Sequence, residues 1–211
     1  MIRMLWILWS LVPVAGAQDA GYVRLFHAVN HGTGKLQVCI NREPVRPGGY
    51  SLGDMTGGIS LSPGIYQIHF ERDGVKTCKT QLTVHSGETT TLVAYAENGK
   101  DGWEIEVMRL KQQDAGDERW VSLVSVSCDL AVEIKQGNGR WSAVSLEKRK
   151  PRRFENGQAS AYLALRNQGR EFTTRSLGMS GHAVVIFYDD ENGESRMKSF
   201  LDYAYGKTIS Q

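Results

Sequence analysis

The sequence has few cysteines, few prolines and almost no excess charge, and each shortage narrows the class of protein. There are 3 Cys, 5 Pro and 23 Gly in 211 residues, and the formal net charge is only +2. With 41% hydrophobic and 23% charged residues, the composition excludes a collagen-like, coiled-coil or mainly disordered chain. The small net charge argues against a whole-surface nucleic-acid binder. Any anion-binding site must therefore be local.

Long apolar runs are missing after the first 17 residues. Arg3 is followed by the apolar stretch from Met4 to Val14 and then by the small residues Ala15-Gly16-Ala17. This pattern predicts a signal peptide over residues 1–17. The apolar run is shorter than the roughly 20 residues that span a bilayer. We therefore expect cleavage after Ala17, a periplasmic or secreted protein, and no transmembrane segment in the mature chain.

The three cysteines raise the question of which two pair in an oxidising compartment. Cys39 and Cys78 lie in the first half of the chain, whereas Cys128 stands alone in the second. A bridge from Cys39 to Cys78 would close a loop of about 40 residues and stabilise the first half by roughly 3 to 4 kcal/mol. Because the two positions differ in phase, the bridge needs a bulge or twist. We predict this disulfide, with Cys128 as a buried free thiol.

Apolar residues alternate with polar ones through most of the chain, which is typical of β-strands with one buried face. Gly, Pro or Asn lie between the alternating segments, where a chain reverses direction. The connections leave no room for crossover helices. The alternating segments are Val23–Leu25, Leu36–Ile40, Ile59–Leu61, Tyr66–Phe70, Leu82–Val84 and Trp103–Val107.

Alternation with regular turns predicts an all-β chain of antiparallel strands packed as sandwiches. The polar stretch 111–116 has no large apolar residue and reads as a linker. We predict two tandem antiparallel β-sandwich domains, residues 21–110 and 117–205, that follow the cleaved signal peptide.

The pattern of the first half recurs in the second. Leu36-x-Val38-x-Ile40 recurs 94 positions later as Leu130-x-Val132-x-Ile134, and Glu97-Asn98-Gly99 recurs at the same offset as Glu191-Asn192-Gly193. Internal duplication explains the shared offset. The alternative is that all β-domains share alternation and Asn-Gly turns.

Three segments carry a family resemblance: Tyr22–Ala28, Leu61–Tyr66 and Leu82–Leu92. They resemble the bacterial extracytoplasmic β-sandwich module known as domain-of-unknown-function family 4397. The whole chain, with its leader and second copy, also resembles the periplasmic accessory proteins of alginate O-acetylation. That resemblance implies two β-domains without catalytic residues, and a role beside a polysaccharide acyltransferase.

Sequence motifs for chemistry are missing. The five His form no H-x-H or H-E-x-x-H pattern, so no metal site is predicted. Gly178–His182 lacks the spacing of a nucleophile elbow. The acidic run Asp189–Glu194 reads as a solvated hairpin tip rather than a Ca²⁺ site. We expect no catalytic residue, no metal and no cofactor.

Two features are candidates for binding. Five cations lie within six positions around Pro151, and an acidic polysaccharide or acidic protein surface would gain from them. Trp141 follows a predicted hairpin turn, where an exposed ring stacks on a sugar or packs under the turn. A solvated loop is the alternative for the cations. The predicted anion-binding or partner-binding residues are Lys148, Arg149, Lys150, Arg152, Arg153 and Trp141.

These observations predict a non-catalytic adaptor or binding module of the cell envelope, and the resemblance implies that it is accessory to O-acetylation of an alginate-type exopolysaccharide. Its expected partners are a membrane-bound or periplasmic acyltransferase or an acidic polysaccharide, and not nucleic acid. A structural or adhesive surface subunit is one alternative. An extracytoplasmic hydrolase is another, and it would require a cleft that gathers a nucleophile, a base and oxyanion donors.

Overall fold

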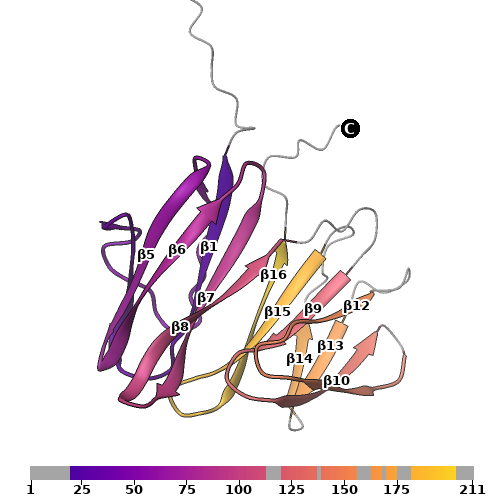
Figure 1. Ribbon diagram of the computed structural model, residues 1–211. Helices are drawn as coiled ribbons and strands as arrows, with labels where there is room; N and C mark the ends of the chain where they lie inside the picture. Colours follow the sequence, from indigo (N-terminus) through magenta and orange to yellow (C-terminus); the bar gives the residue numbers. More distant parts are fainter. Residues whose placement is uncertain are drawn as a thin grey trace, which may run out of the picture.

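The chain is all-β, as predicted. Every regular element in the described part of the chain is a strand, so that part holds no helix able to cross a membrane (Figure 1). The predicted signal peptide and residues 113–116 of the predicted linker lie outside the described residues. The computed structural model describes residues 20–112, 120–136, 139–155, 163–167, 170–174 and 182–202.

The first half forms two groups of four strands. A bridge between Lys76 and Glu104 joins the groups into one eight-stranded sheet. One group has the spatial order β4 (Ile59–Leu61), β1 (Gly21–Ala28), β7 (Thr89–Gly99) and β8 (Gly102–Lys111). The other has the order β3 (Glu43–Pro44), β2 (Thr33–Ile40), β5 (Gly64–Asp73) and β6 (Val75–Val84).

The second half repeats this arrangement strand for strand. Each strand takes the place of the strand eight earlier in the chain, which supports the predicted internal duplication. One sheet has the order β12 (Arg152–Glu155), β9 (Trp120–Ser125), β15 (His182–Asp189) and β16 (Ser195–Asp202). The other has the order β11 (Ser142–Leu146), β10 (Leu130–Gln136), β13 (Leu163–Asn167) and β14 (Arg170–Thr174).

The prediction of purely antiparallel sheets is wrong in three strand pairs: the single bridge between β6 and β8 is parallel, and so are two equivalent longer pairs. β1 runs parallel to β7, with Tyr22 opposite Thr89, and β9 runs parallel to β15, with Trp120 opposite His182. Parallel neighbours need a long crossover, which is usually a helix. Here the intervening strands of each half supply that crossover, so a chain without helices still forms parallel pairs.

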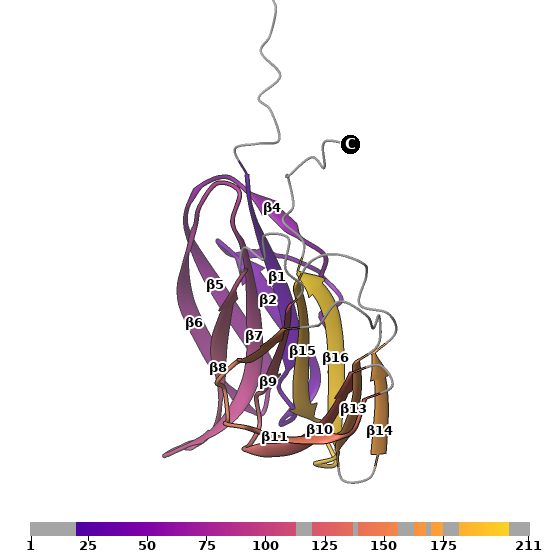
Figure 2. The same ribbon diagram turned by 90° about the vertical axis from the view of Figure 1, so that its right-hand side faces the viewer.

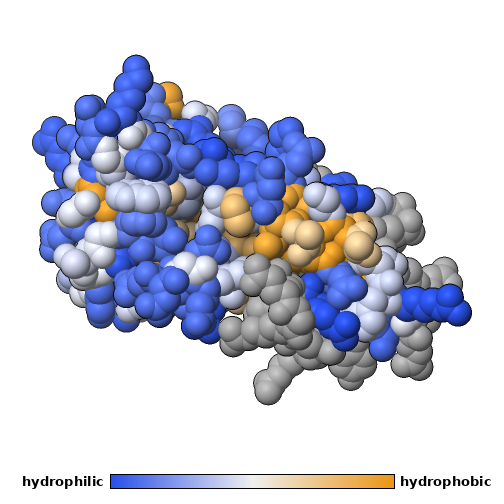
Figure 3. Space-filling model, turned by 90° about the horizontal axis from the view of Figure 1, so that it is seen from below, coloured by the Kyte–Doolittle hydropathy of each residue, from blue (hydrophilic) through white to orange (hydrophobic). Residues whose placement is uncertain are grey.

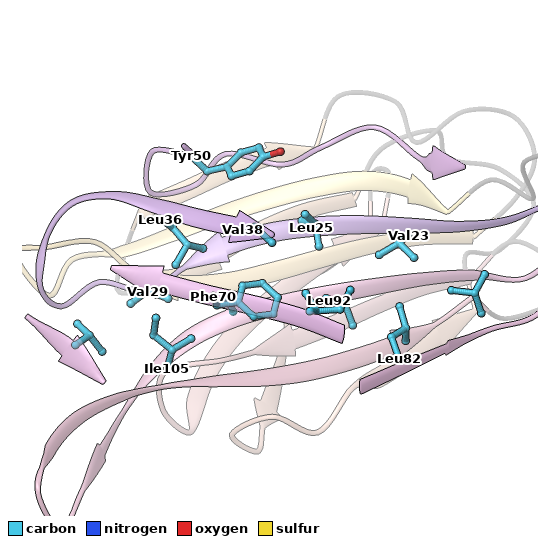
Figure 4. Packing of buried hydrophobic residues seen from close by; sticks show 14 residues of the cluster. Val23, Leu25, Val29, Leu36, Val38, Tyr50, Phe70, Leu82, Leu92 and Ile105 are labelled. Carbon is cyan, nitrogen blue, oxygen red and sulfur yellow. The ribbon is translucent and has the colours of Figure 1, made fainter. Parts of the chain in front are cut away.

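Each half has its own apolar core. In the first half, side chains from both strand groups form one buried cluster, including Val23, Leu36, Phe70 and Leu92 (Figure 4). In the second half, Leu123, Val132, Leu146 and Val185 belong to a corresponding cluster. The alternation in the sequence therefore identified the buried faces. The finer arrangement as two separate sandwich domains remains a prediction.

The structure corrects the predicted disulfide, because Cys39 and Cys78 are free thiols. Cys39 lies opposite His69, and Cys78 lies opposite Phe70, so one strand, β5, separates the two cysteines. Two strand spacings amount to roughly 9.5 Å, beyond the 7 Å that a bridge tolerates between Cα atoms. Their partners are consecutive residues of β5, so the two thiols also lie on opposite faces of the sheet.

Two smaller predictions also change. Cys128 is a free thiol but is exposed rather than buried. Lys111, the first residue of the predicted linker, belongs to β8, and the Gln112 amide donates to the Thr89 carbonyl at 2.9 Å. The first half therefore extends at least two residues further than predicted.

Candidate functional site

The two halves meet through a third buried apolar cluster, which takes side chains from both. Strands β1 and β7 of the first half face β9, β15 and β16 of the second (Figures 1 and 2). The Phe26 ring meets Tyr188 edge to face at a centroid distance of 5.2 Å. The buried members of this interface cluster are Phe26, Ala28, Val93, Tyr95, Val124, Val126, Val184 and Ile186.

Equivalent strands of the two halves contribute equivalent faces to this contact. Phe26 lies beside Val93 in the β1–β7 pair, and Val124 lies beside Ile186 in the β9–β15 pair. All four side chains belong to the interface cluster. A contact of the same patch on both partners is the geometry of a twofold dimer. The two repeats thus pack as two subunits of a symmetric dimer would.

Ion pairs reinforce the interface at separate points. Buried Arg24 of β1 donates to the Asp202 carboxylate at 2.7 Å, and its guanidinium lies 5.3 Å from the Phe200 ring centroid. Buried Arg72 of β5 reaches Glu191, in the turn between β15 and β16, also at 2.7 Å. The acidic run is a hairpin turn, as predicted, but one of its carboxylates pairs with the first half.

Two residues of the predicted basic cluster take part in the same contact. Lys148 Nζ lies 3.0 Å from both carboxylate oxygens of Glu97 in β7. Arg149, with φ of 63°, donates to the Tyr95 hydroxyl at 2.9 Å and pairs with Glu97 at 3.1 Å. The hydrogen bond to Tyr95 is the main cause of a raised pKa for Arg149. These two cations connect the halves.

The other three cations of the cluster point to different partners. Exposed Lys150 pairs with Glu147, which raises the lysine pKa. Arg152 donates to the Ser145 carbonyl at 3.0 Å. Arg153 lies over the Trp120 ring at 5.1 Å. The five cations therefore do not converge on one anion-sized site, and the cluster as a single binding surface remains a prediction.

A cleft between the halves gathers a serine, a histidine and a carboxylate. Ser122 Oγ lies 2.7 Å from His182 Nε2, and His182 Nδ1 lies 3.4 Å from Asp202 Oδ2. Arg24 holds the other carboxylate oxygen of Asp202. The three side chains line a cavity of about 260 Å³, and Lys111 and Arg109 also contribute to its wall. A nucleophile and a base thus meet where sequence spacing predicted neither.

The side-chain contacts that run from Arg24 through Asp202 and His182 to Ser122 have a defined order of hydrogen-bond donors and acceptors. With its proton on Nδ1, His182 donates to Asp202, and its Nε2 accepts the Ser122 hydroxyl proton. The same order of groups activates the serine of hydrolases. Arg109, however, is held by Thr80 Oγ1 and the Gln81 carbonyl, each at 2.7 Å. Lys111 is the remaining cation at this cavity to face a developing oxyanion.

Trp141 lies at an open sheet face of the second half. Its ring has the Arg166 guanidinium at 4.2 Å and Lys135 Nζ at 5.9 Å from its centroid, and it is half-buried. Ala143 of β11 and Ala131 of β10 on this face are small and exposed, and Glu133 of β10, opposite Ala143, pairs with Arg166 at 3.6 Å. Trp141 therefore forms an aromatic platform with cations beside it.

Histidine and metal chemistry is limited in the described residues. No three His, Cys, Asp or Glu side chains in that part of the chain are placed to hold a metal ion. Buried His27 accepts from the Val29 amide at 3.1 Å, and burial followed by the nearby Arg72 charge lowers its pKa to about 3. His27 is thus a neutral core residue.

The cleft could not be predicted from the sequence because its members are far apart in the chain. Ser122 and His182 are 60 positions apart, and His182 and Asp202 are 20 apart. They meet only because β15 pairs with both β9 and β16. Recognition of the parallel β9–β15 pair would have placed His182 near Ser122, but alternation alone carries no such signal.

Comparison with known proteins adds little to this geometry. No protein-family model and no curated protein matches the chain, so the two resemblances stated above remain predictions. Among solved structures, a Bacteroides fragilis protein named as a candidate cell adhesion protein aligns over 90% of this chain and 100% of its own, at 7% identity and a TM-score of 0.24. A likeness at this level carries no argument about fold or function.

Proposed function

We propose that this protein is a non-catalytic binding module of the cell envelope that holds an acidic exopolysaccharide and assists its O-acetylation. The observation that supports this role is the Trp141 platform. A half-buried indole stacks on sugar rings, and the Arg166 and Lys135 cations beside it suit sugar carboxylates.

The surroundings of Trp141 fit a polymer ligand. Exposed Ala131, Ala143 and Ser145 continue the same face of β10 and β11. Glu133 also lies on this face and pairs with Arg166 at 3.6 Å, so a sugar carboxylate would have to compete with it for the guanidinium. Trp141 itself directly precedes β11, whereas Lys135 and Arg166 lie on the paired strands β10 and β13.

The interface between the halves supports the adaptor part of the proposal. The apolar contact and the Arg24, Arg72, Lys148 and Arg149 pairs join two repeats with the same strand order into one unit. One half is then free to hold the polysaccharide while the other meets a partner. The acyltransferase partner, and the periplasmic or secreted location, are parts of this proposal.

The test is binding of a defined polyuronate, measured by isothermal titration calorimetry on the mature chain. Trp141→Ala should weaken binding at least tenfold, which corresponds to about 1.4 kcal/mol. Trp103→Ala, which removes an exposed Trp of the other half, is the matched control and should leave binding unchanged. Equal affinity of the wild type and Trp141→Ala would reject the platform.

The cleft favours a second function, that of an extracytoplasmic acyl-ester hydrolase. Ser122 Oγ would attack the ester carbonyl carbon and pass its proton to His182 Nε2. The alcohol would leave with that proton, and water would release the acyl group from Ser122 by the same steps in reverse order. Asp202 would hold His182 in the required tautomer.

A serine-directed fluorophosphonate separates the two functions. For a hydrolase, the probe should label the wild type but not Ser122→Ala, as seen by mass spectrometry of the intact protein. Ser125→Ala is the matched control, since Ser125 is a buried serine of the same strand that donates to the Cys128 carbonyl. An unlabelled wild type would leave the Ser122 network as a structural contact and favour the binding module.

A further inference from the structure

A second pocket lies at the outer sheet face of the first half, on strands β2, β5 and β6. Cys39 of β2 is opposite His69 of β5, and His69 is opposite Lys79 of β6, so the three form one row across the sheet. The pocket has a volume of about 350 Å³. Its lining residues are Cys39, Arg42, Gln67, Ile68, His69 and Lys79.

Arg42 occupies a backbone position that favours glycine. Asn41 and Arg42 form the two-residue turn between β2 and β3, with φ values of 50° and 74°. Turns of this kind prefer Asn followed by Gly, because a side chain at the second position is disfavoured. Asn41 fastens the turn to β5, since its amide donates to the Gln67 carbonyl at 2.8 Å and its side chain accepts from the Gln67 amide at 2.9 Å. The backbone of Arg42 is thus held beside the pocket.

The polar groups of the pocket lack partners. His69 Nε2 is buried without a hydrogen bond, which is unusual for a buried polar atom. Neither Arg42 nor Lys79 has an ion pair within the described residues. Glu71 follows His69 on the same face of β5, and Glu43 follows Arg42, but no carboxylate lines the pocket. The pocket is cationic and holds an unsatisfied nitrogen.

We propose that this pocket binds an oxyanion, either the carboxylate of an acidic sugar or a free phosphate. Arg42 and Lys79 would supply charged donors, and His69 Nε2 would donate or accept one further hydrogen bond. The volume accommodates a monosaccharide-sized ligand. This inference goes beyond the proposed function, because the pocket is in the other half from Trp141 and does not need that platform.

Cys39 reports directly on occupancy of the pocket. The wild type is alkylated with N-ethylmaleimide at constant ionic strength, with sodium phosphate, sodium glucuronate or glucose present. Peptide mass spectrometry then gives the rate at each cysteine. Exposed Cys128 of the second half is the internal control. A bound oxyanion should slow the reaction of Cys39 at least fivefold and leave that of Cys128 unchanged.

The two anions distinguish the ligand source. Protection by glucuronate alone assigns an acidic sugar, protection by phosphate alone assigns free phosphate, and protection by both assigns a general oxyanion site. Equal protection by neutral glucose would overturn the proposal. So would the absence of protection by either anion at concentrations up to about 10 mM, which cover the dissociation constants of weak ligands.

Two variants of Arg42 make the test specific. Arg42→Gly removes the guanidinium and places glycine where the turn prefers it, so it should raise the melting temperature while protection of Cys39 is lost. Arg42→Lys keeps a cation and should retain partial protection. Full protection in Arg42→Gly would show that Arg42 does not bind the anion and would overturn its assignment.

Discussion

Phe26 is the side chain whose removal tests the interface between the halves most sharply. It is 1% exposed, belongs to the interface cluster and packs edge to face on Tyr188 at 5.2 Å. Truncation of a buried Phe to Ala costs about 3 to 5 kcal/mol through lost burial and the cavity left behind. We expect Phe26→Ala to lower the free energy of unfolding by that amount.

The assay combines guanidinium unfolding with amide hydrogen exchange. If the two halves share this core, Phe26→Ala in β1 should also speed exchange in β15, which belongs to the other half. Phe70→Ala, an equally buried Phe of the first-half core, is the control for a change that does not touch the interface. A loss below about 1 kcal/mol in Phe26→Ala, with exchange in β15 unchanged, would refute the shared core.

Two further predictions concern buried polar groups, and a third concerns the cysteines. Asp202→Asn removes the buried carboxylate charge that Arg24 contacts at 2.7 Å and should destabilise the protein by about 3 to 5 kcal/mol in denaturant unfolding; a change under 1 kcal/mol would mean that the pair contributes little. Because His27 has a pKa of about 3 in the folded chain and 6.5 when unfolded, stability present above pH 6.5 should fall by up to roughly 5 kcal/mol as the pH drops toward 3. His27→Gln should flatten that slope, and an unchanged slope would contradict it. Alkylation of the native, unreduced protein should modify Cys39, and a mass showing a Cys39–Cys78 bridge would contradict the register.

Alternation predicted the strands well where one face is buried and the other is exposed, as in β5 and β6. β1 and β7 are buried on both faces, because their second face packs against the other half. The segments at Val23, Leu36, Ile59 and Tyr66 became β1, β2, β4 and β5, and the Gly-rich stretches between them became turns. The parallel pairs were missed since the period of a strand does not say which neighbour it pairs with. The repeated sequence pattern was more informative about topology, because it implies that both halves have the same strand order.

The binding sites were only partly predictable. Trp141 stood out as an aromatic residue after a turn, but its partner Arg166 is 25 positions away and joins it through the β10–β13 pairing. The basic run suggested one surface, whereas the fold turns Lys148 and Arg149 toward Glu97. The predicted bridge failed because sequence does not reveal that β5 lies between Cys39 and Cys78.

Polar and apolar residues are distributed differently over the surfaces of the two halves. On the face that Figure 3 shows, polar residues cover most of the first half and an apolar area lies on the second half. Neither the polarity nor the exposed apolar area by itself identifies a ligand.

Hydrogen exchange of the mature protein with and without a polyuronate tests the central claim most directly. Binding at the platform should slow amide exchange in β10 and β11, on either side of Trp141, whether or not the pocket on β2, β5 and β6 is also occupied. Exchange in β7 and β8 should stay unchanged at polymer concentrations that saturate the calorimetric titration. Protection confined to the first half, or to the cleft around Ser122, would contradict the proposed binding face.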